Sequence, residues 1–203
     1  MFICYVCIIP LAIVQLIRLP KARRLGTTGV HELGLLLFSF SVIAILSITG
    51  ITPLSGVHLN IVPEQVNLTI GSSIESMRAA SSGTFVRNVV GNVLLFMPLG
   101  FLLPLLWKRN GLFSTVVQGA LFSILIETIQ LFLWRSTDID DVILNTFGTL
   151  AGYVVYVIFR WLAPALSERA GSQKGGVVLP WLLFGVGIVS MFGYGYYQMA
   201  SWA

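Results

Sequence analysis

Six long apolar runs decide what this chain can fold into. A helix needs roughly 20 mostly apolar residues to cross the hydrocarbon core of a bilayer. Five runs meet or approach that length: Leu33–Ile51, Val89–Trp107, Leu112–Trp134, Val142–Leu162 and Val177–Tyr197. A sixth run, Phe2–Leu19, is shorter and holds Arg18 near its end, from where a long side chain reaches the membrane interface. We therefore predict an all-α fold, a polytopic bundle of six transmembrane helices.

The composition excludes the main soluble classes. Hydrophobic residues make up 56% of the chain and charged residues 10%, whereas a soluble domain carries about 25% charged residues. The basic residues stand in short clusters between apolar runs instead of covering one face, so we expect no nucleic-acid partner. Cys4 and Cys7 are too few for a disulfide framework or a zinc site, and we interpret them as small packing residues.

The distribution of lysine and arginine predicts the orientation in the membrane. If residues 21–24 are cytoplasmic, nine of the 12 basic residues lie on the cytoplasmic side, as the positive-inside rule requires. Only Arg78, Arg87 and Arg135 then lie outside. Both termini are expected outside; if Phe2–Leu19 does not span, only the N-terminus changes side.

These spans divide the chain into four parts. We expect two N-terminal helices in residues 1–51, an extracytoplasmic loop in 52–86, a core of three helices in 87–163, and a cytoplasmic loop with the last helix in 164–203. In the long loop, Ser72 and Glu75 have the spacing of a capping box, so Ser73–Ala80 is predicted to be a short helix.

Polar side chains gather at one level of this bundle, near its outer face. They occur where the third span begins, in the last two turns of the fourth, in the short loop that follows, and where the fifth begins. The residues are Arg87, Asn88, Asn92, Glu127, Gln130, Arg135, Asp138, Asp140, Asp141 and Asn145. The predicted orientation places all of them in the outer third of the membrane or just above it.

The spacing of these residues predicts that they face the inside of the bundle. Asp141 and Asn145 lie on one helical stripe with Gly148 and Gly152, a Gly-x-x-x-Gly pair that allows a second helix to approach closely. The fourth span carries a similar stripe, which consists of Ala120, Ser123, Glu127, Gln130 and Trp134.

Several of these features have a purely structural interpretation. The amides of Asn88, Asn92 and Gln130 either hold helices together or contact a ligand, and Asp138 or Asp140 is a candidate cap of the fifth span. Glu127 differs, because a charged carboxylate at membrane depth costs roughly 2.5–3.5 kcal/mol, whereas a polar contact between helices returns about 0.6 kcal/mol. Function is the default hypothesis for such a residue.

The polar residues also carry a family resemblance. The block Asn88-Val-Val-Gly-Asn-Val-Leu-Leu-Phe-Met-Pro-Leu-Gly-Phe101 resembles the first signature of the VanZ-like family. A second block resembles the second signature of the family. It consists of Glu127-Thr-Ile-Gln130 followed by Arg135, Asp138, Asp141 and Asn145-Thr-Phe-Gly148. The resemblance covers about residues 67–156 and implies a protein of the bacterial cytoplasmic membrane. The family's founding member confers low-level resistance to teicoplanin, a glycopeptide with a lipid tail.

Our first functional hypothesis is a site for an anionic envelope molecule at the outer leaflet. Its ligand would be a lipid-linked precursor, a phospholipid headgroup or a lipoglycopeptide, held by Arg87 and Arg135. Glu127 would act as acid or base with Asp138 or Asp141 as its partner. The remaining substrate-binding candidates are Asn88, Asn92, Gln130 and Asn145.

Two other classes of function stay open. In one, the polar cluster is structural and a non-catalytic membrane protein limits access of the antibiotic to the surface. The other is a lipid flippase or transporter. It is disfavoured by the missing inverted repeat and by our expectation that the inner half holds no acidic or amide site.

No metal or other cofactor is expected. Asp138, Asp140 and Asp141 carry oxygen ligands for Mg²⁺ or Ca²⁺. However, Arg135 lies close to them in the sequence, and helix geometry turns Asp140 and Asp141 about 100° apart.

Overall fold

The computed structural model describes residues 13, 17, 28–50, 65–133, 135–172 and 178–202. Its helices are α2 (Gly29–Ile48), α3 (Ser72–Ala80), α4 (Ser82–Leu106), α5 (Leu112–Leu131), α6 (Ile139–Leu162), α7 (Pro164–Ala170) and α8 (Val178–Trp202). Two short strands, β1 (Val66–Asn67) and β2 (Thr137–Asp138), complete the fold. The first predicted span, Phe2–Leu19, lies outside the described residues except for Ile13 and Ile17.

Five of the helices are long and apolar enough to cross a membrane: α2, α4, α5, α6 and α8. They confirm the five long apolar runs and the all-α, multi-pass architecture. The largest difference from the prediction is the start of α4, which begins at Ser82 instead of Val89. Ser81 explains the earlier start, because its side chain accepts a hydrogen bond from the Thr84 amide and caps the helix.

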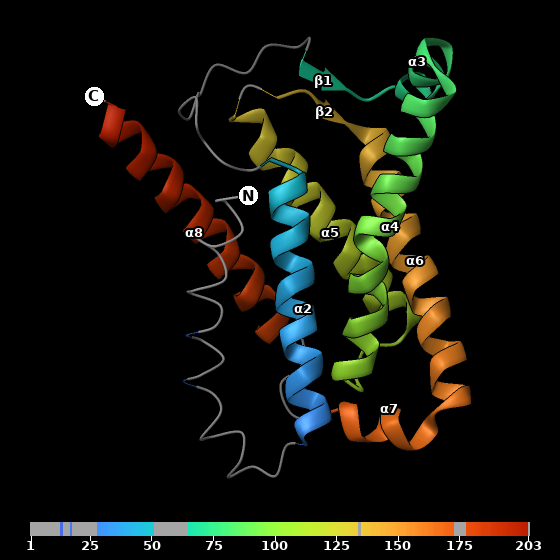
Figure 1. The fold of residues 1–203 in the computed structure, drawn as a ribbon. Helices are drawn as coiled ribbons and strands as arrows, with labels where there is room; N and C mark the ends of the chain where they lie inside the picture. Colours follow the sequence, from blue (N-terminus) through green and yellow to red (C-terminus); the bar gives the residue numbers. More distant parts are fainter. Residues whose placement is uncertain are drawn as a thin grey trace.

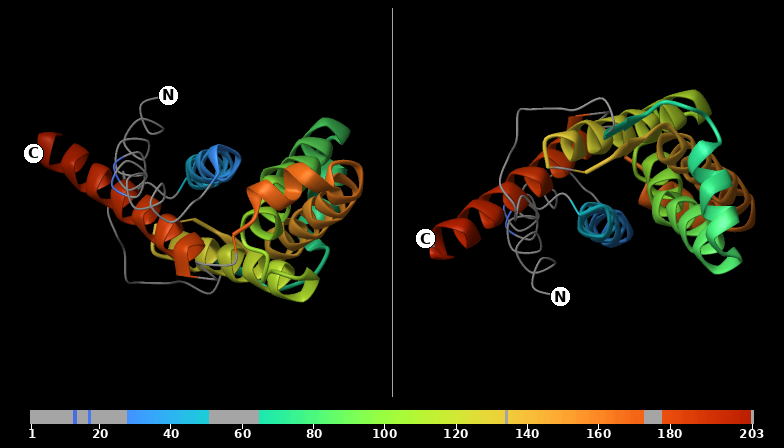
Figure 2. Two further views of the ribbon diagram at one scale, coloured as in Figure 1. Left: turned by 90° about the horizontal axis from the view of Figure 1, so that it is seen from below. Right: turned by 90° about the horizontal axis from the view of Figure 1, so that it is seen from above.

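Four helices, α2, α4, α5 and α6, pack side by side, and α8 crosses one side (Figure 1). The α4 and α6 helices run parallel to each other, and α2 and α5 run in the opposite direction. Figure 1 shows α4 and α6 side by side, with α5 and α2 next to them, and the two views of Figure 2 show α8 running obliquely away from α4 and α6. Aromatic rings join these parts. Phe38 of α2 meets Trp107 edge to face at 5.2 Å, and Phe122 of α5 stacks on Phe184 of α8 at 4.4 Å.

Glycines bring α4 and α6 into backbone contact. A Cβ atom at Gly148 or Gly152 would overlap the carbonyl oxygen of Val93 or Met97, respectively, and one at Gly100 would overlap the Thr149 carbonyl. The Gly-x-x-x-Gly pair of α6 therefore serves close helix packing, as its spacing predicts.

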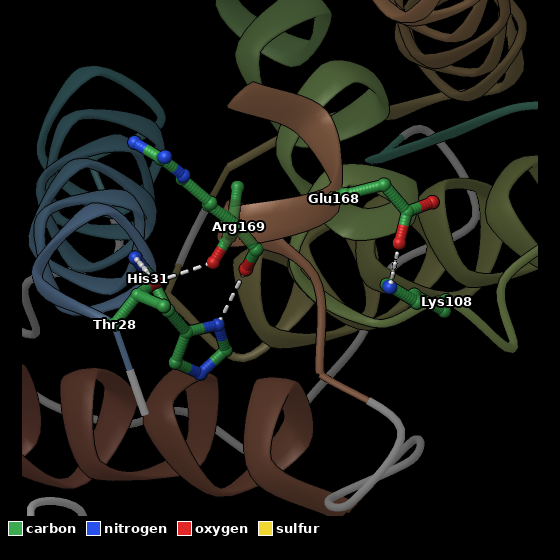
Figure 3. Close-up of polar contacts among 6 residues, drawn as sticks. Thr28, His31, Lys108, Glu168 and Arg169 are labelled. Atoms are coloured by element: carbon green, nitrogen blue, oxygen red, sulfur yellow. Dashed lines mark hydrogen bonds and ion pairs between the residues drawn. The ribbon is translucent and has the colours of Figure 1, made fainter. Parts of the chain in front are cut away.

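At the opposite end from the strands, α7 closes the bundle (Figure 3). The His31 Nδ1–H of α2 donates to the Ala170 carbonyl at 2.6 Å, and the Thr28 hydroxyl donates to the Arg169 carbonyl. The Lys108 ammonium, just after α4, forms an ion pair with Glu168. These contacts hold α7 against the ends of α2 and α4.

Replacing Lys108 with methionine is expected to raise the pKa of Glu168 towards its ordinary value. The hydrogen bond and the charge of Lys108 lower the pKa of this carboxyl. A lowered folded-state pKa stabilises the fold above the unfolded-state pKa, and this contribution disappears as the pH falls through the folded-state pKa. The Glu168 side chain is 66% exposed, so the effect on stability should be small.

Titration of the ¹³C-labelled glutamate carboxyls by NMR would measure the change. An Arg109→Met variant is the control, because Arg109 is a neighbouring cation that does not contribute to the lowered pKa of Glu168. An unchanged Glu168 titration in Lys108→Met would contradict the assignment.

Candidate functional site

The candidate site lies at the end of the bundle where α4 and α6 begin and α5 ends. We call this end, with β1, β2 and α3, the polar end (Figure 1). The two strands pair in parallel, with Val66 opposite Thr137 and Asn67 opposite Asp138. This pairing brings the segment before α3 against the loop that contains β2.

Glu127 is buried at this end, with 4% of its surface exposed. Its Oε2 accepts a hydrogen bond from the Asp138 amide at 3.1 Å, and its carbonyl accepts one from the Thr137 hydroxyl at 2.8 Å. Gln130 is also buried and donates to the Thr49 carbonyl at the end of α2 at 2.8 Å. The end of α5 is thereby tied to β2 and to α2.

Asp138 caps α6, as one of the two alternatives from the sequence anticipated. Its Oδ1 accepts from the Asp140 amide at 2.9 Å. Its Oδ2 accepts from the Ser73 hydroxyl and, at 3.3 Å, from the Asn67 amide group. Sequence reasoning had missed both Asn67 and Ser73, which reach the aspartate only because α3 and β1 are docked on the polar end.

Asp140 caps a different helix from its own. Its carboxylate is 1% exposed and accepts from the backbone amides of Gly71 at 2.7 Å, Ser73 at 3.2 Å and Ile74 at 3.4 Å. The α3 helix exists as predicted, but the predicted capping box is wrong. Ser72 is the first residue of the helix, and the N-cap position is occupied by Gly71, whose φ is 84°. The carboxylate of Asp140 accepts the hydrogen bonds of the backbone amides at this end instead of a capping box.

Asp141 faces α4, where its Oδ1 accepts from the Asn92 side chain at 2.6 Å. Asn88 donates to the sulfur of Met77 at 3.0 Å. The arginines differ from these hydrogen-bonded side chains. Both Arg87 and Arg135 are exposed, and neither forms an ion pair within the part of the chain that the structure describes. The Arg135 guanidinium lies over Gly50, where an added Cβ would come within 2.6 Å of Nη1.

Comparison with known proteins identifies the family. The VanZ/LLP1 family profile matches residues 31–160, which include all but the first two residues of α2 and every polar residue of the site. The chain belongs to the VanZ/LLP1 family. A relative, "Protein VanZ" of Enterococcus faecium, is 36% identical to this chain over 95 residues, which are 46% of this chain and 53% of the relative. The chain therefore matches about half the length of that relative, and no solved structure matches significantly.

The resemblance inferred from the two signature blocks is confirmed, and it extends further than predicted. The second apolar run, Leu33–Ile51, was placed outside the family core, yet the match begins at residue 31. The structure is consistent with this extension: the Gln130 side chain bonds to the Thr49 carbonyl, so the end of α2 is joined to α5.

In this VanZ-family protein a row of buried polar groups continues from Glu127 along α5 and α6. We call it the buried seam. Its buried members are Asn110, Thr115, Gln118, Ser123, Glu127, Asn145 and Thr149, and the partly exposed Ser114 lies at one end. Asn145 donates to the Ser123 hydroxyl at 2.8 Å. Gln118 donates to the Asn110 side chain and to Ser114, each at 3.1 Å.

The seam corrects one expectation from the sequence. We expected no acidic or amide site in the inner half of the bundle, but Asn110 and Gln118 form a buried amide pair there, 5% and 4% exposed. The sequence contained part of this pattern. If the stripe of Ser123 and Glu127 is continued towards the start of α5 in steps of four residues, it reaches Gly119, the neighbour of Gln118, and then Thr115.

The carboxylates do not converge on a common point. Asp138, Asp140 and Asp141 each turn to a different protein donor. Among the described residues no group of three or more His, Cys, Asp or Glu side chains is placed to hold a metal ion.

Proposed function

We propose that this protein binds an anionic, lipid-linked envelope molecule at the outer leaflet of the bacterial cytoplasmic membrane. The positive-inside rule orients the polar end outwards and places α7, Lys108 and Arg109 in the cytoplasm. A sixth span at Phe2–Leu19 and extracytoplasmic termini belong to the same proposal. The ligand is a lipid-linked precursor, a phospholipid headgroup or a lipoglycopeptide.

The observation that carries the proposal is that the acidic and the basic side chains at the polar end differ in their hydrogen bonding. The carboxylates of Glu127, Asp138, Asp140 and Asp141 accept hydrogen bonds from protein donors. By contrast, Arg87 and Arg135 are exposed and form no ion pair among the described residues. The α3 helix adds the exposed pair Glu75 and Arg78 to the same end. Guanidinium groups bind phosphate and carboxylate through two parallel hydrogen bonds. Two free arginines at one level of the membrane therefore fit an anionic headgroup.

Glu127 is the proposed acid or base. Its Oε2 accepts a hydrogen bond from the Asp138 amide, so the position of the carboxylate is defined before a ligand binds. Asp141 is its proposed partner. Asp138 acts as a positioning residue in this scheme, because its two oxygens are occupied by the cap of α6 and by Ser73.

The named relative, Protein VanZ, makes teicoplanin resistance the phenotype to test. In a susceptible bacterial host we expect the protein to raise the inhibitory concentration of teicoplanin. Glu127→Gln and Arg135→Ala should both return it to the value of cells carrying an empty vector. Arg135→Lys should retain part of the effect, because it keeps the charge but not the two-pronged geometry.

Arg109→Ala is the matched control, since it removes an exposed arginine from the opposite end of the bundle. All variants must be shown to reach the membrane in equal amounts. Full resistance with Glu127→Gln and Arg135→Ala would refute the proposed site.

A non-catalytic role is the second candidate, and specific bonds favour it. Gln130 with Thr49, Asn92 with Asp141, and Asp140 with α3 all hold elements together. Mass spectrometry of lipid precursors incubated with purified protein separates the two. A changed precursor mass supports catalysis, whereas an unchanged mass together with loss of folding in the polar-site variants supports the structural role.

A further inference from the structure

The buried seam contains oxygen atoms that the protein itself does not satisfy. The side-chain oxygens of Thr115, Gln118 and Asn145 are buried and have no hydrogen-bond partner among the described residues. Thr115 and Gln118 belong to α5, and Asn145 belongs to α6. Buried polar atoms are nearly always paired with protein or with water, so three unpaired oxygens in one row require a common explanation.

Choosing the other amide orientation does not remove the problem. Rotating the Asn145 amide by 180° would let its oxygen accept from Ser123, but its nitrogen would then be unpaired. Gln118 behaves in the same way, because all its bonds are made by Nε2 to acceptors on Asn110 and Ser114. Either orientation leaves one polar atom of each amide for a partner that is not protein.

Other hydroxyl groups in the bundle form hydrogen bonds within their own helices. Ser39, Thr128, Thr146 and Ser190 each donate to the carbonyl four residues earlier in their own helix. Thr115 is fully buried and makes no such bond. Its hydroxyl is available to a molecule in the seam.

The spacing of the seam suits a file of water molecules. From Ser114, which is partly exposed, to Glu127 the rise along α5 is about 20 Å at roughly 1.5 Å per residue. The longest interval, between Gln118 and Ser123, is bridged by Thr149, whose side chain fills the space left by Gly119.

We propose that the seam is a water-filled proton pathway that connects the end of the bundle at Ser114 with the carboxylate of Glu127. A proton enters at Ser114 and passes between waters held by Gln118, Thr115, Thr149 and Asn145. It adds to the Glu127 carboxylate. The resulting acid releases a proton to solvent at the polar end, which restores the carboxylate, and the reverse direction uses the same groups.

Proton flux into proteoliposomes tests this pathway. The purified full chain is reconstituted, a potassium diffusion potential is imposed with valinomycin, and the internal pH is followed with a trapped dye. The wild-type protein should conduct protons above protein-free vesicles. Gln118→Leu and Glu127→Gln should reduce the flux to the protein-free level.

The decisive comparison is Thr149→Val against Thr128→Val. Both threonines donate to the carbonyl four residues earlier, but Thr149 is buried in the seam and Thr128 lies off it. Thr149→Val should lower the flux and Thr128→Val should not, with equal melting temperatures in detergent as the check on folding.

Wild-type flux equal to that of protein-free vesicles would overturn the proposal, as would equal flux in the two threonine variants. Thr149 donates to the backbone carbonyl of Asn145, and among the described residues it forms no hydrogen bond with Arg87 or Arg135, the groups proposed to hold the headgroup. The proton flux of the Thr149→Val variant therefore tests the pathway independently of the proposed lipid-binding function.

Discussion

Replacing Gly152 with alanine is expected to lower the free energy of unfolding by about 3 kcal/mol, the upper end of the range for overpacking. The added methyl would overlap the Met97 carbonyl oxygen and lie 2.8 Å from the Phe101 amide nitrogen. Both obstructions are backbone atoms of α4. No side-chain rotation relieves them, so α4 and α6 must separate where Gly152 meets Met97 and Phe101.

Two other glycines provide graded controls. At Gly34 the obstruction is the Leu106 side chain at 2.5 Å, which can move, so Gly34→Ala should cost less. At Gly91 no atom lies within 4 Å, and Gly91→Ala should be neutral or stabilising by up to about 1 kcal/mol. Unfolding in mixed micelles by SDS titration measures all three. A Gly152→Ala variant as stable as Gly91→Ala would show that the helices are not in backbone contact.

The features that were predictable from the sequence are those that repeat along a helix. Runs of about 20 apolar residues predicted the five described spans, because bilayer thickness imposes their length. The stripe of Asp141, Asn145, Gly148 and Gly152 predicted which face of α6 points into the bundle, because side chains four residues apart share a face. In both cases the information is local.

The features that were missed depend on partners far away in the chain. Asp140 looked like a cap for its own helix, yet it accepts from the Gly71 amide, 69 residues earlier. The pairing of β1 with β2 had no strand signal, since each strand has two residues. A sequence pattern does not reveal which distant groups a fold brings into contact.

Replacing Asp140 with alanine is the second change from which we expect a large effect. Its carboxylate accepts from three backbone amides at the start of α3, and a hydrogen bond to a charged group contributes about 1.5–3 kcal/mol. In the variant these amides lose their only charged acceptor. The start of α3 should therefore detach from α6 while the membrane-spanning helices stay folded.

Hydrogen exchange and proteolysis report this detachment separately from global unfolding. A loss of about 3 kcal/mol corresponds to exchange of the Gly71, Ser73 and Ile74 amides about 100-fold faster. Trypsin should also cleave after Arg78 more rapidly. Glu75→Ala is the control, because this exposed carboxylate in the first turn of α3 should contribute at most about 1 kcal/mol through the helix dipole.

The same variant separates two roles of the polar end. Asp138 binds Ser73 as well as capping α6, so release of α3 removes one partner of Asp138 but leaves its bond to the Asp140 amide. Glu127 then keeps the Asp138 amide that orients its Oε2. If Asp140→Ala loses α3 docking but keeps teicoplanin resistance, Glu127 and the arginines suffice for function. If resistance is lost with Glu127 still in place, α3 itself forms part of the surface that the ligand must contact.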